Sequence, residues 1–151
     1  MTKAGEAPDC VLCVALEGAG SAGSLVVHVA PSCFVLMNLY PYNSGHLMVA
    51  PRRHVASLAE ATLDELSELM ALARRLESVM REAYRPEGLN LGMNLGRVAG
   101  AGVADHLHLH IVPRWRGDTN FMSVAGEVRV LPEDLPETWA RLRGALDESH
   151  G

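Results

Sequence analysis

The amino-acid sequence predicts an α+β domain in which helices pack against a five-stranded antiparallel sheet. Five short segments with high strand propensity are separated by turn-forming residues. One long segment repeats apolar residues at three- and four-residue steps, the spacing of an amphipathic helix. Several connections between strands are as short as hairpins, which favours antiparallel pairing. We therefore expect one long and one shorter helix on the sheet, in a single domain over residues 1–151.

The strands are expected where apolar segments lie between clusters of glycine, proline and asparagine. A glycine-rich turn at residues 18–23 precedes the first strand, and YPYNSG at residues 40–45 forms the turn before the third. A loop of small residues at 96–104 leads into the fifth strand. The predicted strands are residues 25–30, 33–39, 46–50, 89–95 and 106–113.

The long helix is expected to begin at a capping box, because Thr62 is followed three residues later by Glu65. Its apolar residues recur along one face as far as Pro86 and Gly88, which end the helix. The shorter helix is expected at residues 137–146, with a tryptophan and two leucines on its apolar side.

Composition and charge exclude several classes of function. Hydrophobic residues make up 48% and charged residues 21%, the balance of a soluble globular protein. The formal net charge of −5 argues against a nucleic-acid polymer as partner, although local donors can still bind a small phosphate ligand. No apolar run is long enough to span a bilayer, and the first residues lack the apolar stretch of a signal peptide. We expect a cytoplasmic protein without a membrane partner.

Three of the 7 histidines alternate along the last predicted strand, in the sequence HLHLHIVPR. His106, His108 and His110 are expected to line one face of that strand at intervals of about 6–7 Å, while the residues between them face the core. Three interpretations compete: a solvated strand face, zinc ligation by the three imidazoles, and covalent catalysis in which a neutral imidazole attacks phosphorus.

A glycine-rich loop opens directly onto this strand and favours phosphate chemistry. Residues 94–104 read NLGRVAGAGVA, and such loops expose backbone N–H groups that bind phosphate oxygens. Phosphoryl transfer depends on positioning and electrostatic support, which backbone donors supply. The unperturbed pKa of histidine, about 6.5, leaves an attacking imidazole mostly neutral at pH 7.

The combination of these motifs resembles a known family. HLHLHIV is similar to the signature of the histidine triad superfamily, in which three alternating histidines are followed by apolar residues. The resemblance runs from Cys10 to about Met122 and includes VLMNLYPYNSGHLMVAPRRH and the glycine loop. NLYPYNSGHLMVAP together with HLHLHIVPRWRGDTNFM looks closest to the diadenosine tetraphosphate phosphorylase-like branch.

The resemblance implies a role for each histidine of the site. His108, the middle one, would be the nucleophile that forms a nucleotidyl-histidine intermediate. His110 would contact the α-phosphate or the leaving-group oxygen, and His106 would belong to the catalytic group as the first of the three. His46 would sit behind His108 and hold the tautomer of its ring, with a backbone carbonyl as a further candidate nearby.

The resemblance also implies nucleotide contacts, a fold and an assembly. Asn38 would bind the ribose, and the fold would be the five-stranded sheet with the active form a homodimer. The α-phosphate would be held by Asn94, Gly100, Ala101, Gly102 and Val103, together with His110. Many relatives have Gln, Ser or Thr late in the glycine loop, where this chain has Ala101, Val103 and Ala104. Backbone donors would therefore carry more of the phosphate binding.

Two of the 3 cysteines, Cys10 and Cys13, have the spacing of metal ligands. In a reducing compartment this spacing indicates metal or redox chemistry more than a disulfide. The resemblance to some bacterial histidine triad proteins implies that this pair, His54 and His106 hold a structural zinc. The alternative is two buried thiols near a surface histidine. Cys33 lies in an apolar strand and is expected in the core, and we expect no organic cofactor.

We expect an enzyme that cleaves a dinucleoside polyphosphate at the α-phosphate through His108. Phosphorolysis, with orthophosphate as acceptor, is favoured over hydrolysis by the resemblance to the phosphorylase-like branch. A hydrolase of AMP-phosphoramidate or other adenylates is an alternative within the same chemistry. A zinc-dependent hydrolase with His106, His108 and His110 as ligands, and a nucleotide-binding module without catalysis, are the other two hypotheses.

Overall fold

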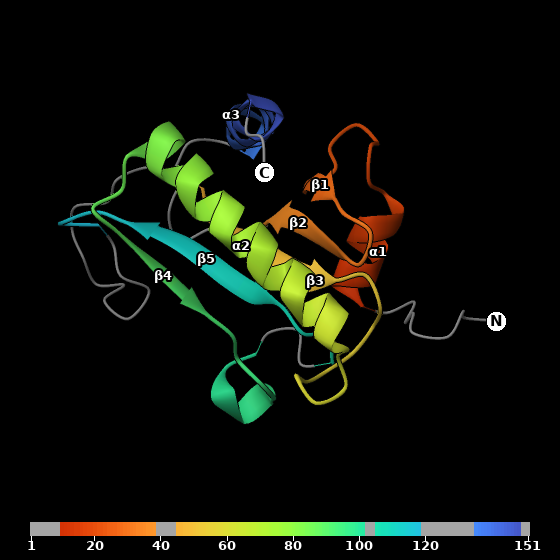
Figure 1. Cartoon of the computed structure of the whole chain (residues 1–151). Coiled ribbons are helices and arrows are strands. Elements are labelled where there is room, and N and C mark those ends of the chain that lie inside the picture. The colour runs from red at the N-terminus through yellow and green to blue at the C-terminus, as the bar shows by residue number, and fades with distance from the viewer. Residues whose placement is uncertain (1–9, 39–44, 102–104, 119–134, 149–151) are drawn as a thin grey trace.

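The computed structural model describes residues 10–38, 45–101, 105–118 and 135–148 (Figure 1). Its five strands form one sheet in the order β1-β2-β3-β5-β4, and every neighbouring pair is antiparallel. The strands are β1 (Val26–Val29), β2 (Cys33–Met37), β3 (Leu47–Pro51), β4 (Gly88–Gly92) and β5 (Leu109–Arg114). The predicted fold class is therefore confirmed.

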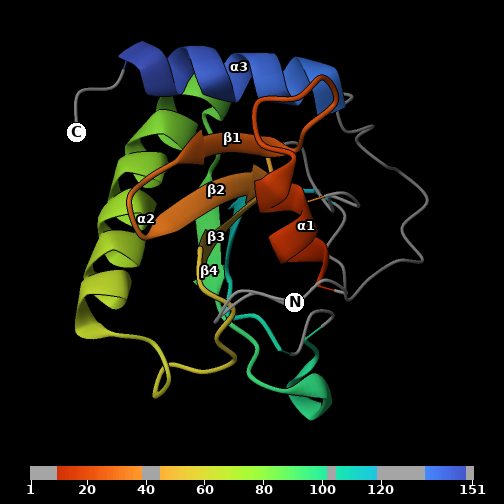
Figure 2. The ribbon, with the colours of Figure 1, turned by 90° about the vertical axis from the view of Figure 1, so that its right-hand side faces the viewer.

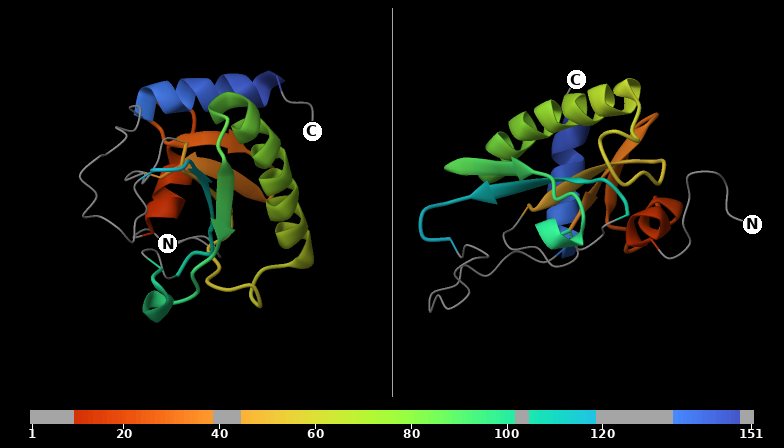
Figure 3. Two further views of the ribbon diagram at one scale, coloured as in Figure 1. Left: turned by 90° about the vertical axis from the view of Figure 1, so that its left-hand side faces the viewer. Right: turned by 90° about the horizontal axis from the view of Figure 1, so that it is seen from below.

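Helices cover the sheet on both faces (Figures 2 and 3). The long helix α2 and the C-terminal helix α3 share one core with the sheet, and α1 packs on the opposite face. A short 3-10 turn, η1, follows β4 along the chain. The elements are α1 (Val11–Glu17), α2 (Leu63–Tyr84), η1 (Arg97–Ala99) and α3 (Leu135–Glu148).

The two central strands have apolar partners on both faces. All five residues of β2 and of β3 are buried. In β2, Val35 points into the core under α2 and α3, whereas Phe34 and Leu36 belong to the core under α1. The face of the sheet toward α1 is therefore apolar at β2 and β3, and His110 of β5 lies next to Met48 on that face.

The helix α1 is not among the elements that the sequence patterns predict. Its seven residues, VLCVALE, include two β-branched valines, and the residue before it, Cys10, makes no side-chain capping bond. A helix this short is unstable alone and is held by tertiary contacts. Leu12 and Cys13 supply these contacts, because both are buried against the sheet.

The last strand begins later than predicted. Pairing of β5 with β3 starts at Leu109 opposite Val49, so His106 and His108 precede the paired strand. There the chain makes other contacts, and the N–H of Leu107 donates to the carbonyl of Val55 at 2.7 Å. The expectation of three histidines in one regular strand is therefore wrong for the first two. β4 also ends early, at Gly92.

The capping box that begins α2 is present as predicted. The N–H of Glu65 donates to Thr62 Oγ1 at 3.1 Å, and the N–H of Thr62 donates to the Glu65 carboxylate at 2.8 Å. Arg53, from the segment after β3, donates to both oxygens of the same carboxylate at 2.8 and 3.0 Å. The N-terminus of α2 thus anchors the segment that follows β3.

The two edges of the sheet differ. Side chains of α3 cover the outer edge of β1, where Trp139 Nε1 donates to the carbonyl of Val26 at 3.0 Å and Arg143 donates to that of Val27 at 2.8 Å. In the described residues no strand pairs with the outer edge of β4, where Leu91 is 46% exposed. None of the described helices has the length and apolar content to cross a membrane.

Candidate active site and metal centre

Three histidines meet on the face of the sheet that carries α1. His110 pairs with Met48 across β3 and β5, and Met48 belongs to the core under α1. His46 immediately precedes β3, and two residues further along this strand the alternation brings Met48 to the same face. The rings of His108 and His110 lie 4.9 Å apart, and those of His46 and His110 lie 5.2 Å apart.

The ring of His108 is fixed by a backbone group. Its Nδ1 lies 2.8 Å from the carbonyl oxygen of His106, which can only accept a hydrogen bond. Nδ1 therefore carries the proton, and a neutral ring keeps its lone pair on Nε2. The side chain is also buried, with 4% of its surface exposed. This arrangement prepares Nε2 of His108 to act as a nucleophile.

His46 and His110 form a second, hydrogen-bonded pair. Nε2 of His46 lies 3.0 Å from Nδ1 of His110, and the amide nitrogen of Asn38 lies 3.4 Å from Nδ1 of His46. Burial, aided by the neighbouring histidines, lowers the pKa of both His46 and His110 to about 4. Both rings are therefore neutral near pH 7, and protonation of either one would place a charge in a buried position.

The structure changes the expected contacts of His46. The expectation was that His46 holds the tautomer of His108. Its ring instead contacts that of His110, and the carbonyl of His106 holds His108. The resemblance offered a backbone carbonyl as a further candidate, but every residue carries one, so only the fold shows that it belongs to His106.

His106 belongs to a different cluster from the other two histidines of the motif. Its Nδ1 lies 3.3 Å from Cys10 Sγ, 3.5 Å from Cys13 Sγ and 3.3 Å from His54 Nδ1. The four ligand atoms all lie within 4.8 Å of one another. Nε2 of His106 lies 2.7 Å from the carbonyl oxygen of Pro51, so Nε2 carries the proton and Nδ1 presents its lone pair to the cluster.

These distances fit a tetrahedral metal centre. Zinc–nitrogen and zinc–sulfur bonds of ordinary length place two nitrogen ligands about 3.3 Å apart, and a nitrogen and a sulfur about 3.6 Å apart. The two histidine nitrogens are 3.3 Å apart, and Cys13 Sγ lies 3.5 Å from each of them. Cys10, Cys13, His54 and His106 can therefore hold a metal ion.

The alternative in which His106, His108 and His110 share a metal is not favoured. Within the described residues, the cluster of metal-ligating groups is the one that includes both cysteines, and His108 and His110 do not belong to it. The ring of His106 is turned toward the cysteines, and its expected place in the catalytic group stays a prediction. Cys33 is fully buried in the core and its thiol donates to the Glu65 carbonyl.

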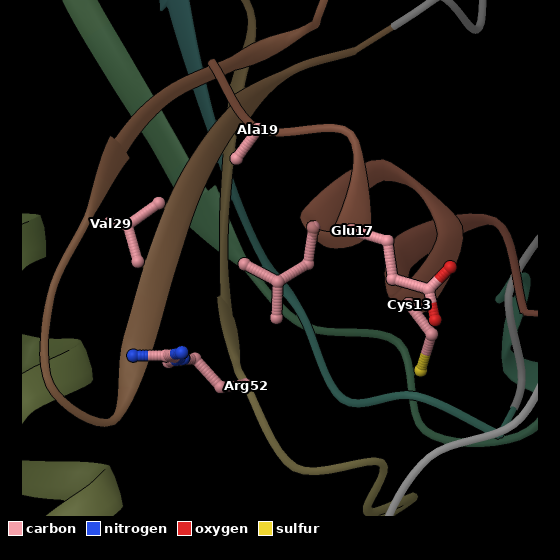
Figure 4. A pocket seen from close by; sticks show the side chains of 6 residues that line it. Cys13, Glu17, Ala19, Val29 and Arg52 are labelled. Carbon is pink, nitrogen blue, oxygen red and sulfur yellow. The ribbon is translucent and has the colours of Figure 1, made fainter. Parts of the chain in front are cut away.

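A shallow pocket of about 320 Å³ lies beside the metal cluster. Residues of α1 and of the turn after it form one wall, and Val29 and Arg52 form the other (Figure 4). Cys13 lines this pocket, so one cysteine of the cluster borders space that small molecules can enter.

The glycine loop is only partly described, and its described part differs from expectation. The N–H groups of Gly100 and Ala101 donate to the carbonyls of Arg97 and Gly96, so they are not free donors. The cause is the 3-10 turn η1, which uses them to close the loop. Asn94 is exposed beside Gly100, and the predicted phosphate contacts Gly102 and Val103 lie outside the described residues.

Two groups of the site escaped the sequence analysis. The carbonyl of Pro51 fixes the ring of His106, and the ion pair of Arg53 with Glu65 anchors the segment that carries His54. The Arg53 contact could have been suspected, since Glu65 was already identified in a capping box and Arg53 adjoins a candidate metal ligand. The Pro51 contact has no such signal.

The chain is similar in sequence to known proteins. A model of the HIT domain matches residues 20–117. AP-4-A phosphorylase of Mycobacterium tuberculosis is 45% identical over 124 residues, which are 78% of this chain and 64% of that protein, so the match spans less than two thirds of that relative. Bis(5'-adenosyl)-triphosphatase of Dictyostelium discoideum is 36% identical over 85 residues, or 56% of each protein.

A solved structure shares the whole fold. A Zn-bound histidine triad family protein from Mycobacterium smegmatis superimposes with a TM-score of 0.74, at 27% sequence identity, over 93% of this chain and 94% of that one. Because the family model spans most of the chain and a solved histidine triad protein has the same fold, the chain belongs to the HIT domain family.

Proposed function

We propose that the protein cleaves dinucleoside polyphosphates at the α-phosphate, with Nε2 of His108 as the nucleophile. The observation that carries the proposal is the 2.8 Å hydrogen bond from His108 Nδ1 to the His106 carbonyl, which leaves the lone pair of Nε2 for attack. The relatives support the substrate class, because two of them are an AP-4-A phosphorylase and a bis(5'-adenosyl)-triphosphatase.

The reaction proceeds in two displacements at one phosphorus. Nε2 of His108 attacks the α-phosphorus of diadenosine tetraphosphate, the bond to the bridging oxygen breaks, and ATP leaves. His110, beside the nucleophile, binds the α-phosphate or the leaving oxygen. An oxygen of orthophosphate then attacks the adenylyl group, the P–N bond breaks, and ADP forms. If water attacks instead, the second product is AMP, and the triphosphatase relative makes this hydrolysis the second candidate.

The nucleotide is expected to lie over the α1 face of the sheet. Asn38, next to His46, is proposed to bind the ribose. Asn94 is proposed to contact the α-phosphate, with Gly102 and Val103 as backbone donors. Gly100 and Ala101 would join them only if the turn η1 opens, because their N–H groups are engaged within the loop.

The metal in the cluster of Cys10, Cys13, His54 and His106 is proposed to be zinc. The support is the donor set of two sulfurs and two nitrogens at tetrahedral spacing, together with the Zn-bound relative. Four protein ligands fill a tetrahedral zinc site and leave no position for substrate, so the ion would not act on the phosphate directly.

The assembly is proposed to be a homodimer that pairs the outer edges of two β4 strands. The support is the contrast between the edges of the sheet, since α3 covers β1 whereas β4 is uncovered in the described residues. An uncovered edge with exposed Leu91 favours pairing with a second copy.

Product analysis with diadenosine tetraphosphate tests the reaction. ADP and ATP are expected in equal amounts, and only when orthophosphate is present. His108→Ala should lower kcat on the order of 10⁴-fold or more, because it removes the nitrogen that is proposed to form the intermediate, while nucleotide affinity changes little. His28→Gln, a histidine on β1 outside the site, is the control. AMP and ATP irrespective of phosphate would replace phosphorolysis by hydrolysis, and normal turnover by the alanine variant would remove His108 as nucleophile.

Metal analysis tests the zinc assignment. The purified protein should contain about one zinc per chain, and the cobalt-substituted form should show thiolate-to-cobalt absorption of a tetrahedral site. Cys10→Ser should lose most of the metal, whereas Cys33→Ala, which removes a buried thiol outside the cluster, should keep it. Unchanged zinc content in Cys10→Ser would show that the metal lies elsewhere.

Sedimentation velocity tests the dimer. The wild-type protein should sediment as a dimer, and Leu91→Glu should shift it to monomer, because two like charges would meet at the paired edges. Leu63→Glu is the matched control, since Leu63 lies on α2 and is 82% exposed. A dimer that persists in Leu91→Glu would place the interface away from β4.

The pH dependence of stability tests the buried pair of histidines. Imidazoles of the unfolded chain bind protons as the pH falls through 6.5, whereas those of His46 and His110 resist protonation down to about 4. The free energy of unfolding should therefore decrease between pH 7.5 and 5, on the order of 1–2 kcal/mol per imidazole.

The variant His110→Asn removes one of these imidazoles. It also removes a neighbour that helps to lower the pKa of His46, so the difference between the two urea-denaturation profiles reports both effects of His110. The variant should lose less stability than the wild type as the pH falls. An equal loss in both proteins would mean that burial does not lower the pKa of His110.

A further inference from the structure

His106 connects the metal cluster to the nucleophile within one residue. Its ring takes part in the cluster, with Nδ1 3.3 Å from Cys10 Sγ. Its carbonyl oxygen accepts the 2.8 Å hydrogen bond from Nδ1 of His108. The position of the ring and the direction of the carbonyl are set by the same backbone, so a change in one is transmitted to the other.

The backbone at His106 lies outside the ladder of the sheet. Pairing between β3 and β5 begins at Leu109, so strand hydrogen bonds do not hold the two residues before it. In the described residues this segment is anchored by Leu107 N–H to the Val55 carbonyl and by the ring of His106. The contacts of the His106 ring therefore hold this segment in place where strand hydrogen bonds are missing.

The ring is fully anchored only when its second nitrogen has a partner. Nε2 of His106 uses its proton for the Pro51 carbonyl, so Nδ1 of the neutral ring is an acceptor. It faces two sulfurs and a nitrogen at 3.3–3.5 Å, and it can accept a proton from only one of them at a time. With a cation bound, all four ligand atoms share one centre and this competition ends.

We propose that the metal cluster is a positioning device for His108, which holds the His106 carbonyl so that Nδ1 of the nucleophile keeps its proton and Nε2 its lone pair. This inference rests on the proposed function for its effect on rate, but its effect on the tautomer of His108 is independent of it. Loss of the metal slows the chemical step through the backbone of His106, without any contact between the ion and the nucleotide.

One residue of the cluster borders a pocket, while the cluster itself is buried. Cys13 lines the pocket between α1 and Arg52 and is 6% exposed (Figure 4). The remaining anchors of the segment, at Pro51 and Val55, do not involve the metal. We therefore expect that a chelator removes the metal without unfolding the sheet.

Nuclear magnetic resonance of protein labelled with ¹⁵N in its histidines tests the proposal. Long-range ¹H–¹⁵N spectra distinguish the protonated and unprotonated ring nitrogens, and the His108→Ala spectrum assigns the signals of that ring. The zinc-loaded wild type should show a single His108 tautomer protonated at Nδ1. After chelation, His108 should show a mixture of tautomers, and kcat should fall by about 10- to 100-fold with a much smaller change in KM.

Added zinc should restore both the tautomer and kcat. Cys13→Ser should reproduce the metal-free spectrum, and Cys33→Ala, a buried cysteine of the core, should keep the loaded one. If Cys13→Ser does not fold, chelation of the wild type provides the same comparison. A folded metal-free protein that keeps the Nδ1-protonated tautomer would overturn the proposal. A loaded protein that cleaves no dinucleoside polyphosphate would overturn the function but not the coupling.

Discussion

The hydrogen bond between Nδ1 of His108 and the carbonyl of His106 is the interaction on which the site depends. It determines which nitrogen of the His108 imidazole keeps a lone pair, and no other described contact holds that ring in one tautomer. The carbonyl is in turn directed by the Pro51 contact of the His106 ring, and Arg53 ties the following segment to α2 through Glu65. The orientation of the His108 ring thus depends on a series of contacts that ends at Glu65 of α2, on the opposite face of the sheet.

The two faces of the sheet differ, because one is covered by the larger apolar core and the other carries His110. The face under α2 and α3 is closed by a continuous apolar core that includes Leu109 and Ile111. These two residues alternate with His110 along β5, so the same strand is anchored on one face and presents His110 on the other. On the α1 face, the apolar cluster reaches Met48 of β3, and His110 lies next to Met48 on the neighbouring strand.

Sequence patterns predicted the secondary-structure elements and the cysteine pair better than the individual hydrogen bonds of the site. Strand alternation, the capping box and the spacing of Cys10 and Cys13 indicated the sheet, the start of α2 and half of the metal cluster, because each is carried by side-chain types. The helix α1 was missed, since tertiary packing rather than propensity stabilises it. The rings of His106 and His108 are held by the backbone carbonyls of Pro51 and His106. No residue type reveals which carbonyl makes such a contact.

The contrast between the two edges of the sheet also limits how the protein can assemble. Trp139 and Arg143 occupy the carbonyls of β1, so a further strand cannot add there without displacing α3. Among the described residues β4 is the edge that stays open to a further strand, and the proposed two-fold pairing would occupy that edge in both copies. The described part of the chain therefore favours closed pairs and disfavours open-ended, fibrous stacking of sheets.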